Sequence, residues 1–220
     1  MKKKLTIALL LGFCTLPATA QNWSIGVRTG AFVFGDLLER RVQPIAGDPD
    51  DDATTLTLTA KTRPGLAVDL ERRLADRWAV RFEGTFTRAP LALRDPSNDE
   101  GDIHSGDLDV TTFTVPLVFR INTGGAFRFH LLGGPAYVLY VFKPDNAAGV
   151  PIPDDARAEW GVQVGGGVTW HVSERFGVEG AISDVATRSP IERTDLPNLP
   201  GFKIPRPHNI HTTVGIRYRF

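Results

Sequence analysis

The sequence predicts an all-β fold: an eight-stranded antiparallel up-and-down transmembrane β-barrel with short periplasmic turns and four long external loops. Three observations predict this fold class. Apolar residues recur with a period of two along most of the chain, which is the period of a strand with two different faces. Short and long connections alternate between these segments. The chain begins with the features of an export signal.

Residues 1–20 have the three parts of a secretory signal peptide. Lysines follow the initiator methionine, an apolar run covers 5–16, and a small-x-small site ends at Ala20. The apolar run is too short to cross a membrane as a helix. We therefore predict cleavage after Ala20 and one outer-membrane β-barrel domain at residues 21–220. Cys14 is the only cysteine, so we expect no disulfide and no cysteine-based site in that domain.

Eight segments of the predicted domain alternate between apolar and polar residues. Their length is about ten residues or somewhat more, and a tilted strand needs about 9–11 residues to cross a bilayer. We predict one transmembrane strand in each segment. The segments cover residues 23–33, 56–70, 78–86, 113–121, 127–139, 160–170, 176–182 and 210–220.

The connections between these segments fall into two length classes. Long irregular loops are uncommon inside a compact soluble domain. Short turns at one end and long loops at the other are typical of outer-membrane barrels, and an even strand number places both termini on the periplasmic side. Tight turns are predicted at 72–77, 122–125 and 173–175, and long polar loops at 35–54, 88–107, 143–156 and 184–209.

The alternation separates an apolar face from a charged face. In a soluble barrel the apolar face would line the interior, whereas in a membrane barrel it contacts lipid and the charged face lines the lumen. Aromatic residues beside the short turns favour the membrane arrangement, because aromatic girdles mark the bilayer interfaces. The predicted girdle consists of Trp78, Trp170, Phe176, Tyr218 and Phe220.

Charged residues of both signs lie on the predicted lumen face. An eight-stranded barrel is just wide enough for side chains to fill it, and an unpaired ion there would cost several kcal/mol. We therefore expect a lumen closed by paired charges, with a narrow small-solute channel as the alternative. The predicted members of this network are Asp69, Arg81, Glu83, Arg120, Arg128, Glu179 and Arg217.

The last nine residues, TTVGIRYRF, resemble the C-terminal insertion signal of bacterial outer-membrane proteins. That signal has the form polar-x-Gly-x-x-aromatic-x-aromatic, and its four defined positions are filled by Thr213, Gly215, Tyr218 and Phe220. The resemblance implies that the barrel-assembly machinery recognises this strand during insertion.

Three inner stretches resemble the bacterial outer-membrane β-barrel domain family, including its OmpA-barrel-like and PorT-like members. They are 113–120 with a Pro-Leu pair, 127–137 with a Gly-Pro pair, and the glycine-rich 160–167. The resemblance covers most of the predicted domain, and it implies the fold and an outer-membrane location but no catalytic residues. Pro116 removes a ladder N–H in mid-strand, so we expect a bulge or a local gap there.

These observations favour a structural or surface-interaction role through the external loops, with outer-membrane lipid and lipopolysaccharide as neighbours. Removal of the three signal lysines leaves 22 basic against 25 acidic residues, so no basic excess indicates nucleic acid. We predict no cofactor and no enzyme activity. Acidic segments at 48–52 and 95–102 offer oxygen ligands suited to calcium or magnesium, although solvated acidic loops are the default interpretation.

A lipid A-modifying enzyme is the lesser alternative. His171 and Ser173 have the His-x-Ser spacing of lipid A deacylases. They fall on the short-turn side of the predicted barrel, whereas lipid A lies in the outer leaflet. We therefore expect these two residues to form part of a turn.

Overall fold

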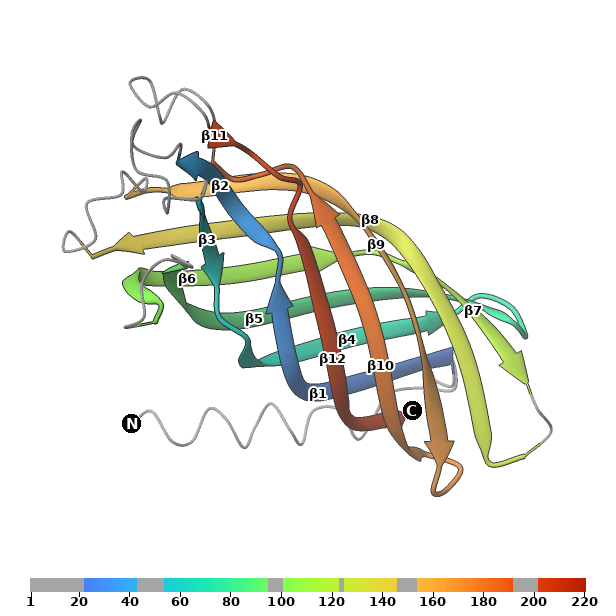
Figure 1. The fold of residues 1–220 in the computed structure, drawn as a ribbon. Coiled ribbons are helices and arrows are strands. Elements are labelled where there is room, and N and C mark those ends of the chain that lie inside the picture. Colours follow the sequence, from blue (N-terminus) through green and yellow to red (C-terminus); the bar gives the residue numbers. More distant parts are fainter. Residues whose placement is uncertain (1–21, 43–53, 95–100, 123–124, 146–153, 192–201) are drawn as a thin grey trace, which may run out of the picture.

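The structure is a computed structural model that describes residues 22–42, 54–94, 101–122, 125–145, 154–191 and 202–220. The predicted signal peptide and most of the two acidic segments lie outside the described residues. In the described parts, no helix is long and apolar enough to cross a membrane. The strands in chain order (Figure 1) are β1 (Trp23–Phe34), β2 (Asp36–Val42), β3 (Thr54–Ala60), β4 (Arg63–Arg73), β5 (Trp78–Arg94), β6 (Ile103–Thr114), β7 (Leu117–Asn122), β8 (Phe127–Pro144), β9 (Ala156–His171), β10 (Phe176–Thr187), β11 (Phe202–Lys203) and β12 (His208–Arg219).

These strands form eight staves, where a stave is one continuous wall segment of the barrel. β1 continues into β2, β3 into β4, β6 into β7, and β11 into β12, while β5, β8, β9 and β10 are staves by themselves. All neighbouring staves pair antiparallel. β1 pairs with β12 from Ser24↔Arg219 to Phe34↔Asn209, so the sheet closes. The predicted eight-stranded antiparallel barrel is confirmed.

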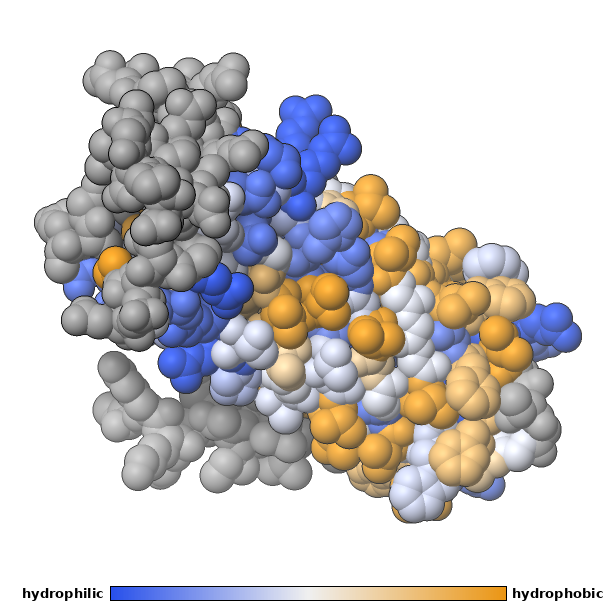
Figure 2. Space-filling view, viewed as in Figure 1, coloured by the Kyte–Doolittle hydropathy of each residue, from blue (hydrophilic) through white to orange (hydrophobic). Residues whose placement is uncertain are grey.

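An apolar belt surrounds the half of the barrel that carries the short turns. Side chains such as Leu131 and Ile216 point outward and are 56% and 60% exposed, while the alternate residues point into the barrel. Figure 2 shows hydrophobic side chains gathered over this half and hydrophilic ones between the belt and the external end. The predicted inversion, with apolar residues outside and charges inside, therefore describes this half of the barrel.

Two aromatic rows limit the belt on β8 and β9. Phe127 and Trp170 stack at the turn end with their ring centroids 6.3 Å apart, and Tyr137 contacts Trp160 edge-on at 5.1 Å. A strand rises about 3.3 Å per residue and tilts about 40° in such barrels, so the rows stand about 25 Å apart, which is the height of the apolar band of an outer-membrane barrel. The sequence predicted only the row at the turn end.

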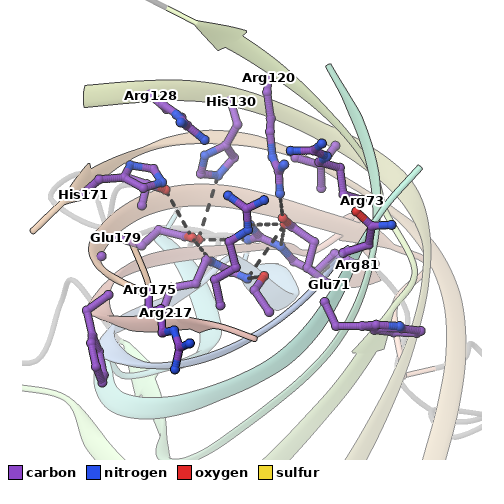
Figure 3. A pocket seen from close by; sticks show the side chains of 18 of the residues that line it. Glu71, Arg73, Arg81, Arg120, Arg128, His130, His171, Arg175, Glu179 and Arg217 are labelled. Carbon is purple, nitrogen blue, oxygen red and sulfur yellow. Dashed lines mark hydrogen bonds and ion pairs between the residues drawn. The ribbon is translucent and has the colours of Figure 1, made fainter. Parts of the chain in front are cut away.

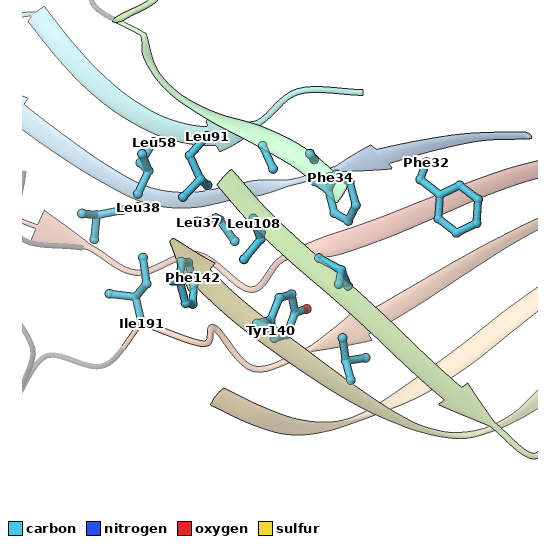
Figure 4. Packing of buried hydrophobic residues seen from close by; sticks show 14 of the residues in the cluster. Phe32, Phe34, Leu37, Leu38, Leu58, Leu91, Leu108, Tyr140, Phe142 and Ile191 are labelled. Atoms are coloured by element: carbon cyan, nitrogen blue, oxygen red, sulfur yellow. The ribbon is translucent and has the colours of Figure 1, made fainter. Parts of the chain in front are cut away.

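The strands continue well beyond the belt, and three of the predicted loop boundaries are therefore wrong. The expected loop at 35–54 contains β2, the loop at 88–107 contains the end of β5 and the start of β6, and the loop at 184–209 contains β11. The strands continue because their inward side chains form a second, apolar core (Figure 4). We call this core the apolar cap: Phe32, Phe34, Leu37, Leu38, Leu58, Ala60, Ala89, Leu91, Leu108, Val110, Ala136, Val138, Tyr140, Phe142, Val185 and Ile191.

The second stave shows how one apolar pattern serves two environments. In β4, Leu66 and Val68 face outward and are 48% and 41% exposed, whereas in β3 Leu58 and Ala60 face inward and are buried. The irregular residues 61–62 between the two strands switch the faces. The apolar side chains thus face lipid in the belt and face each other above it.

Pro116 interrupts the fourth stave without opening the wall. β6 ends at Thr114 and β7 begins at Leu117. On one side the backbone N–H of Arg81 donates to the Pro116 carbonyl at 3.0 Å, and on the other the Val115 N–H donates to the Pro135 carbonyl at 3.1 Å. The wall therefore keeps backbone hydrogen bonds on both sides of the interruption.

Candidate functional site

A charge network fills the lumen inside the belt (Figure 3). Each side chain comes from the inward parity of its strand, and six of the eight staves contribute, through β1, β4, β5, β7, β10 and β12. Except for Arg120, which is 20% exposed, every charged side chain of the network is at most 9% exposed. The network consists of Arg28, Arg81, Arg120 and Arg217 with Asp69, Glu71, Glu83 and Glu179.

Arg81 and Arg217 are the centres of this network. The Arg81 Nε and Nη2 donate to Glu71 Oε2 at 2.9 and 2.7 Å, and its Nη1 donates to Glu179 Oε1 at 3.0 Å. The Arg217 Nε donates to Glu179 Oε2 at 2.5 Å, and its Nη2 donates to Asp69 Oδ1 at 2.7 Å. Such charge-assisted, multidentate bonds are the strongest hydrogen bonds that side chains form.

The other two arginines extend the network along the lumen axis. Arg28 donates to Asp69 at 3.2 Å and also to Glu83, while Arg120 donates to Glu71. Four arginines thus face four carboxylates, and the network is formally neutral. Neutrality is a condition for placing ions in a narrow lumen, because an unpaired buried ion costs several kcal/mol.

Glycines on the inward parity make room for these long side chains. A Cβ at Gly215 would lie 2.5 Å from Arg28 Cα, and a Cβ at Gly26 would lie 3.0 Å from Arg217 Nη2. At Gly215 the neighbour is backbone, which leaves no room for a methyl group, whereas at Gly26 the Arg217 and Asp69 side chains would have to shift. Gly215, the glycine of the C-terminal insertion signal, is therefore also required by the packing of the lumen.

The apolar cap closes the lumen a second time, on the external side of the network. Tyr140 is fully buried there, and its hydroxyl group contacts Thr187 Oγ1 at 3.0 Å and accepts from Asn209 Nδ2 at 2.9 Å. Leu108 on β6 pairs in register with Ala89 on β5 and with Phe142 on β8, so this wall directs apolar side chains into the interior (Figure 4). The cap is packed as a hydrophobic core.

A polar cavity opens at the turn end, below the charge network. It is open to solvent, and the space that the centre of a water molecule can occupy within it is about 60 Å³. Its floor is formed by members of the network, and its walls carry further arginines and two histidines (Figure 3). We call this cavity the mouth. Outside the network, the charged and histidine side chains that line it are Arg73, Arg128, His130, His171, Glu174, Arg175 and Arg219.

Six of the seven residues predicted for the network lie in it, and Arg128 is the exception. Arg128 lines the mouth, and among the described residues no carboxylate pairs with its guanidinium. It lies nearer the turn than His130 on β8. The predicted network did not include Arg28 or Glu71, although both follow the inward parity of their strands. Arg28 lies on the charged face of its predicted segment, and Glu71 directly follows Leu70, where the predicted segment ended.

The residues of the predicted girdle lie at the turn end, and these include Tyr218 and Phe220 of the insertion signal, whereas Thr213 and Gly215 lie in the middle of β12. Trp78 contacts Phe119, with ring centroids 4.9 Å apart, and Phe176 contacts Tyr218 at the same distance. Tyr218 and Phe220 form an edge-on pair at 5.3 Å. Thr213 points inward and is 7% exposed.

The two residues with deacylase-like spacing lie at the turn between β9 and β10. The Ser173 hydroxyl accepts the backbone N–H of Phe176 at 3.0 Å, which fixes this turn. His171 lines the mouth. This location is at the turn end of the belt, opposite to the apolar cap.

The model of the family described as the outer membrane protein beta-barrel domain matches residues 6–220. Three solved structures are similar: OprG from Pseudomonas aeruginosa (TM-score 0.57, 13% identity, covering 91% of this chain and 97% of that chain), Neisserial surface protein A (0.55, 8%, 90% and 97%), and AlkL (0.53, 11%, 94% of both). At these identities the likeness shows the fold. No curated protein matches the sequence.

Proposed function

Because the chain belongs to the outer membrane protein beta-barrel domain family, we propose that it is an integral outer-membrane protein with a closed lumen that acts through its external face. Its role is structural or surface-interactive, and no transported solute is needed to explain it. Insertion through the barrel-assembly machinery, by means of the C-terminal residues 213–220, is part of this proposal.

The observation that carries the proposal is the double closure of the lumen. A solute entering from the mouth first meets Arg81 and Glu179, which join opposite walls. Beyond them it meets Leu91, Leu108 and Tyr140, each 0% exposed. A water-filled path would require both a broken ion pair and an opened hydrophobic core. Both changes are costly.

The external half of the barrel supports a role in contacts. Strands β2, β3 and β11 and the upper ends of β5, β6 and β8 form a sheet around the apolar cap, which gives the outer face a rigid base. The segments 43–53, 95–100, 146–153 and 192–201 connect strand ends on this side. Segments that connect the strands of a rigid scaffold are common carriers of binding.

A charged cluster on the outward wall supports contact with lipopolysaccharide. Arg88 Nε and Nη2 donate to Asp109 at 2.5 and 3.0 Å, and Lys143 Nζ donates to the same carboxylate at 2.7 Å. The cluster lies just above the upper aromatic row, at the level of the headgroups. Its two cations suit phosphate groups of the outer leaflet, and a second acid, Asp107, lies beside them in register with Lys143.

The surface role is tested with bacterial cells that display the protein and lack other adhesins. We compare adhesion to glass, to epithelial cells and between the cells themselves for the wild type and a variant in which 43–53 and 146–153 are replaced by short Gly-Ser linkers. The proposal expects adhesion by the wild type and its loss in the variant at equal surface levels. Equal behaviour of wild-type, variant and empty cells contradicts a surface-interaction role.

A narrow solute channel is the second candidate function, and the solvent-filled mouth is the observation that favours it. The mouth extends only to the charge network, so we expect it to be a closed vestibule. Swelling of proteoliposomes in small sugars and amino acids separates the two functions: a channel gives swelling that increases with protein content, whereas a closed barrel gives none.

A further inference from the structure

The arginines of the mouth exceed what the charge network needs. The network is balanced by itself, with four arginines and four carboxylates. Besides Arg219, which interacts with other groups, the lining of the mouth adds Arg73, Arg128 and Arg175, but only one further acid, Glu174. Asp76 lies 3.9 Å from Arg73 and is 98% exposed, so it screens that arginine weakly. The mouth therefore has a net positive charge.

Arg73 and Arg128 have the inward parity of their strands, and Arg175 lies in the β9–β10 turn. Arg128 lies between Phe127 and Phe129, which face lipid and are about half exposed, so its own side chain has the inward parity. Figure 3 shows Arg120, Arg128 and His130 projecting from one wall into the cavity. Lateral contact with lipid headgroups, the usual role of arginines at a membrane interface, does not account for this orientation.

Two buried histidine nitrogens provide a second, independent observation. His130 is 5% exposed, and its Nε2 has no hydrogen-bond partner among the described residues; the closest acid, Glu179, is 3.9 Å away. The Nδ1 of His171 is also buried without a partner there. Buried polar atoms are normally hydrogen-bonded, and both histidines line the mouth. The cavity thus contains unused hydrogen-bonding capacity beside its excess positive charge.

We propose that the mouth is a binding site for a phosphate-class oxyanion on the periplasmic side of the barrel. Arg73 reaches it from β4, Arg128 from β8 and Arg175 from the β9–β10 turn. Planar guanidinium groups that approach from several directions match the several oxygens of a tetrahedral anion. The phosphate is either free in the periplasm or part of a phospholipid headgroup of the inner leaflet.

Calorimetric titration of the refolded wild type with inorganic phosphate, in a maltoside detergent, tests the soluble source. The double variant R128Q/R175Q removes two mouth arginines that lie outside the network. Its matched control, R188Q/R94Q, removes two arginines at the external end of the barrel. Heat-modifiable gel migration and circular dichroism establish that each variant is folded.

A second titration tests the lipid source, with nanodiscs that contain phosphatidylcholine and increasing phosphatidylglycerol, followed by native mass spectrometry of retained lipid. We expect saturable one-to-one binding of at least one probe, weakened at least about tenfold in R128Q/R175Q and unchanged in R188Q/R94Q, because one charge-assisted hydrogen bond contributes roughly that factor. Absence of saturable binding of both probes, or equal binding by the two folded variants, overturns the proposal.

Discussion

Arg81 donates from Nη1 to Glu179 Oε1 at 3.0 Å, although the two residues are 98 positions apart in the chain. Arg81 is on β5 and Glu179 on β10, and in either direction around the barrel three staves separate those two strands. The bond therefore spans the lumen from wall to opposite wall. Because both residues also bind other members of the network, loss of either one affects several strands at once.

Substitution of Glu179 by Gln removes the carboxylate that Arg81 and Arg217 share. We expect the free energy of unfolding in lipid vesicles to fall by about 3–5 kcal/mol, because the change leaves buried arginines without their counter-charge. Glu174→Gln, at the exposed turn, is the matched control and should change little. If the two variants unfold alike, the network does not hold the barrel together.

Gly215→Ala is expected to weaken the seam between β1 and β12. The added Cβ would lie 2.5 Å from Arg28 Cα, and backbone in a paired strand has little room to yield. Gly180→Ala on neighbouring β10 is the control, since nothing lies within 4 Å of its added Cβ. Urea unfolding of both variants should show a loss of about 1–3 kcal/mol only for Gly215→Ala. The idea fails if Gly180→Ala is equally destabilised.

Tyr140→Phe tests the apolar cap. The change removes a hydroxyl group that bonds Thr187 and Asn209 and leaves their polar atoms buried. We expect a loss of about 1–3 kcal/mol of unfolding free energy. Tyr137→Phe changes the same chemical group three residues away on the outward face and should be nearly neutral. If Tyr140→Phe leaves the free energy of unfolding unchanged, water reaches the polar atoms of Thr187 and Asn209, and the cap is hydrated.

The limits of the lipid-facing belt are tested by an arginine scan on β9. Val164 faces outward between Trp160 and Trp170 and is 55% exposed. Val164→Arg should cost about 2–4 kcal/mol of stability in bilayers, the price of a cation near the midplane. Ala158→Arg lies on the same face but beyond Trp160, where about 0–1 kcal/mol is expected. Equal effects at the two positions contradict the proposed upper boundary.

The cluster of Arg88, Asp109 and Lys143 above the belt predicts that the stability of the folded state depends on pH. The hydrogen bond from Arg88, followed by that from Lys143, holds the pKa of Asp109 below its ordinary value of 3.8. Since the folded pKa is the lower one, the stabilisation is present above the ordinary pKa and is lost as the pH falls through the folded pKa. Carbon-13 NMR titration should show this low pKa, and Arg88→Gln should raise it. An ordinary pKa in the wild type contradicts the pairing.

Much of the belt was predictable because its signals are local. A period of two identifies the strands, and aromatic residues such as Trp170 and Phe176 mark the turn end. The structure extends this picture above the belt, where the apolar residues face inward. Nothing in the run from Leu56 to Ala60 distinguishes a lipid-facing strand from one that faces a core. The neighbouring β2 lacks a clean alternation because a register shift near Leu37 and Leu38 buries both residues.

The partners within the network were less predictable than its members. Parity shows which charges enter the lumen, and it selected Arg81, Glu179 and Arg217 correctly as inward-facing residues. Height along the barrel axis depends on the stagger between strands, which is set by the closure of the whole sheet. For that reason Arg128 was assigned to the network but lies at the mouth, while Arg28, at a suitable height, was not selected.

Single-channel conductance of the refolded wild type in planar bilayers tests the closed lumen most directly. With Arg81 bonded to Glu179 across the interior and Tyr140 buried in the cap above them, we predict no steady ionic current across the voltage range that the bilayer tolerates. A steady, reproducible open level in the wild-type protein would contradict the account, because ions would then pass both closures.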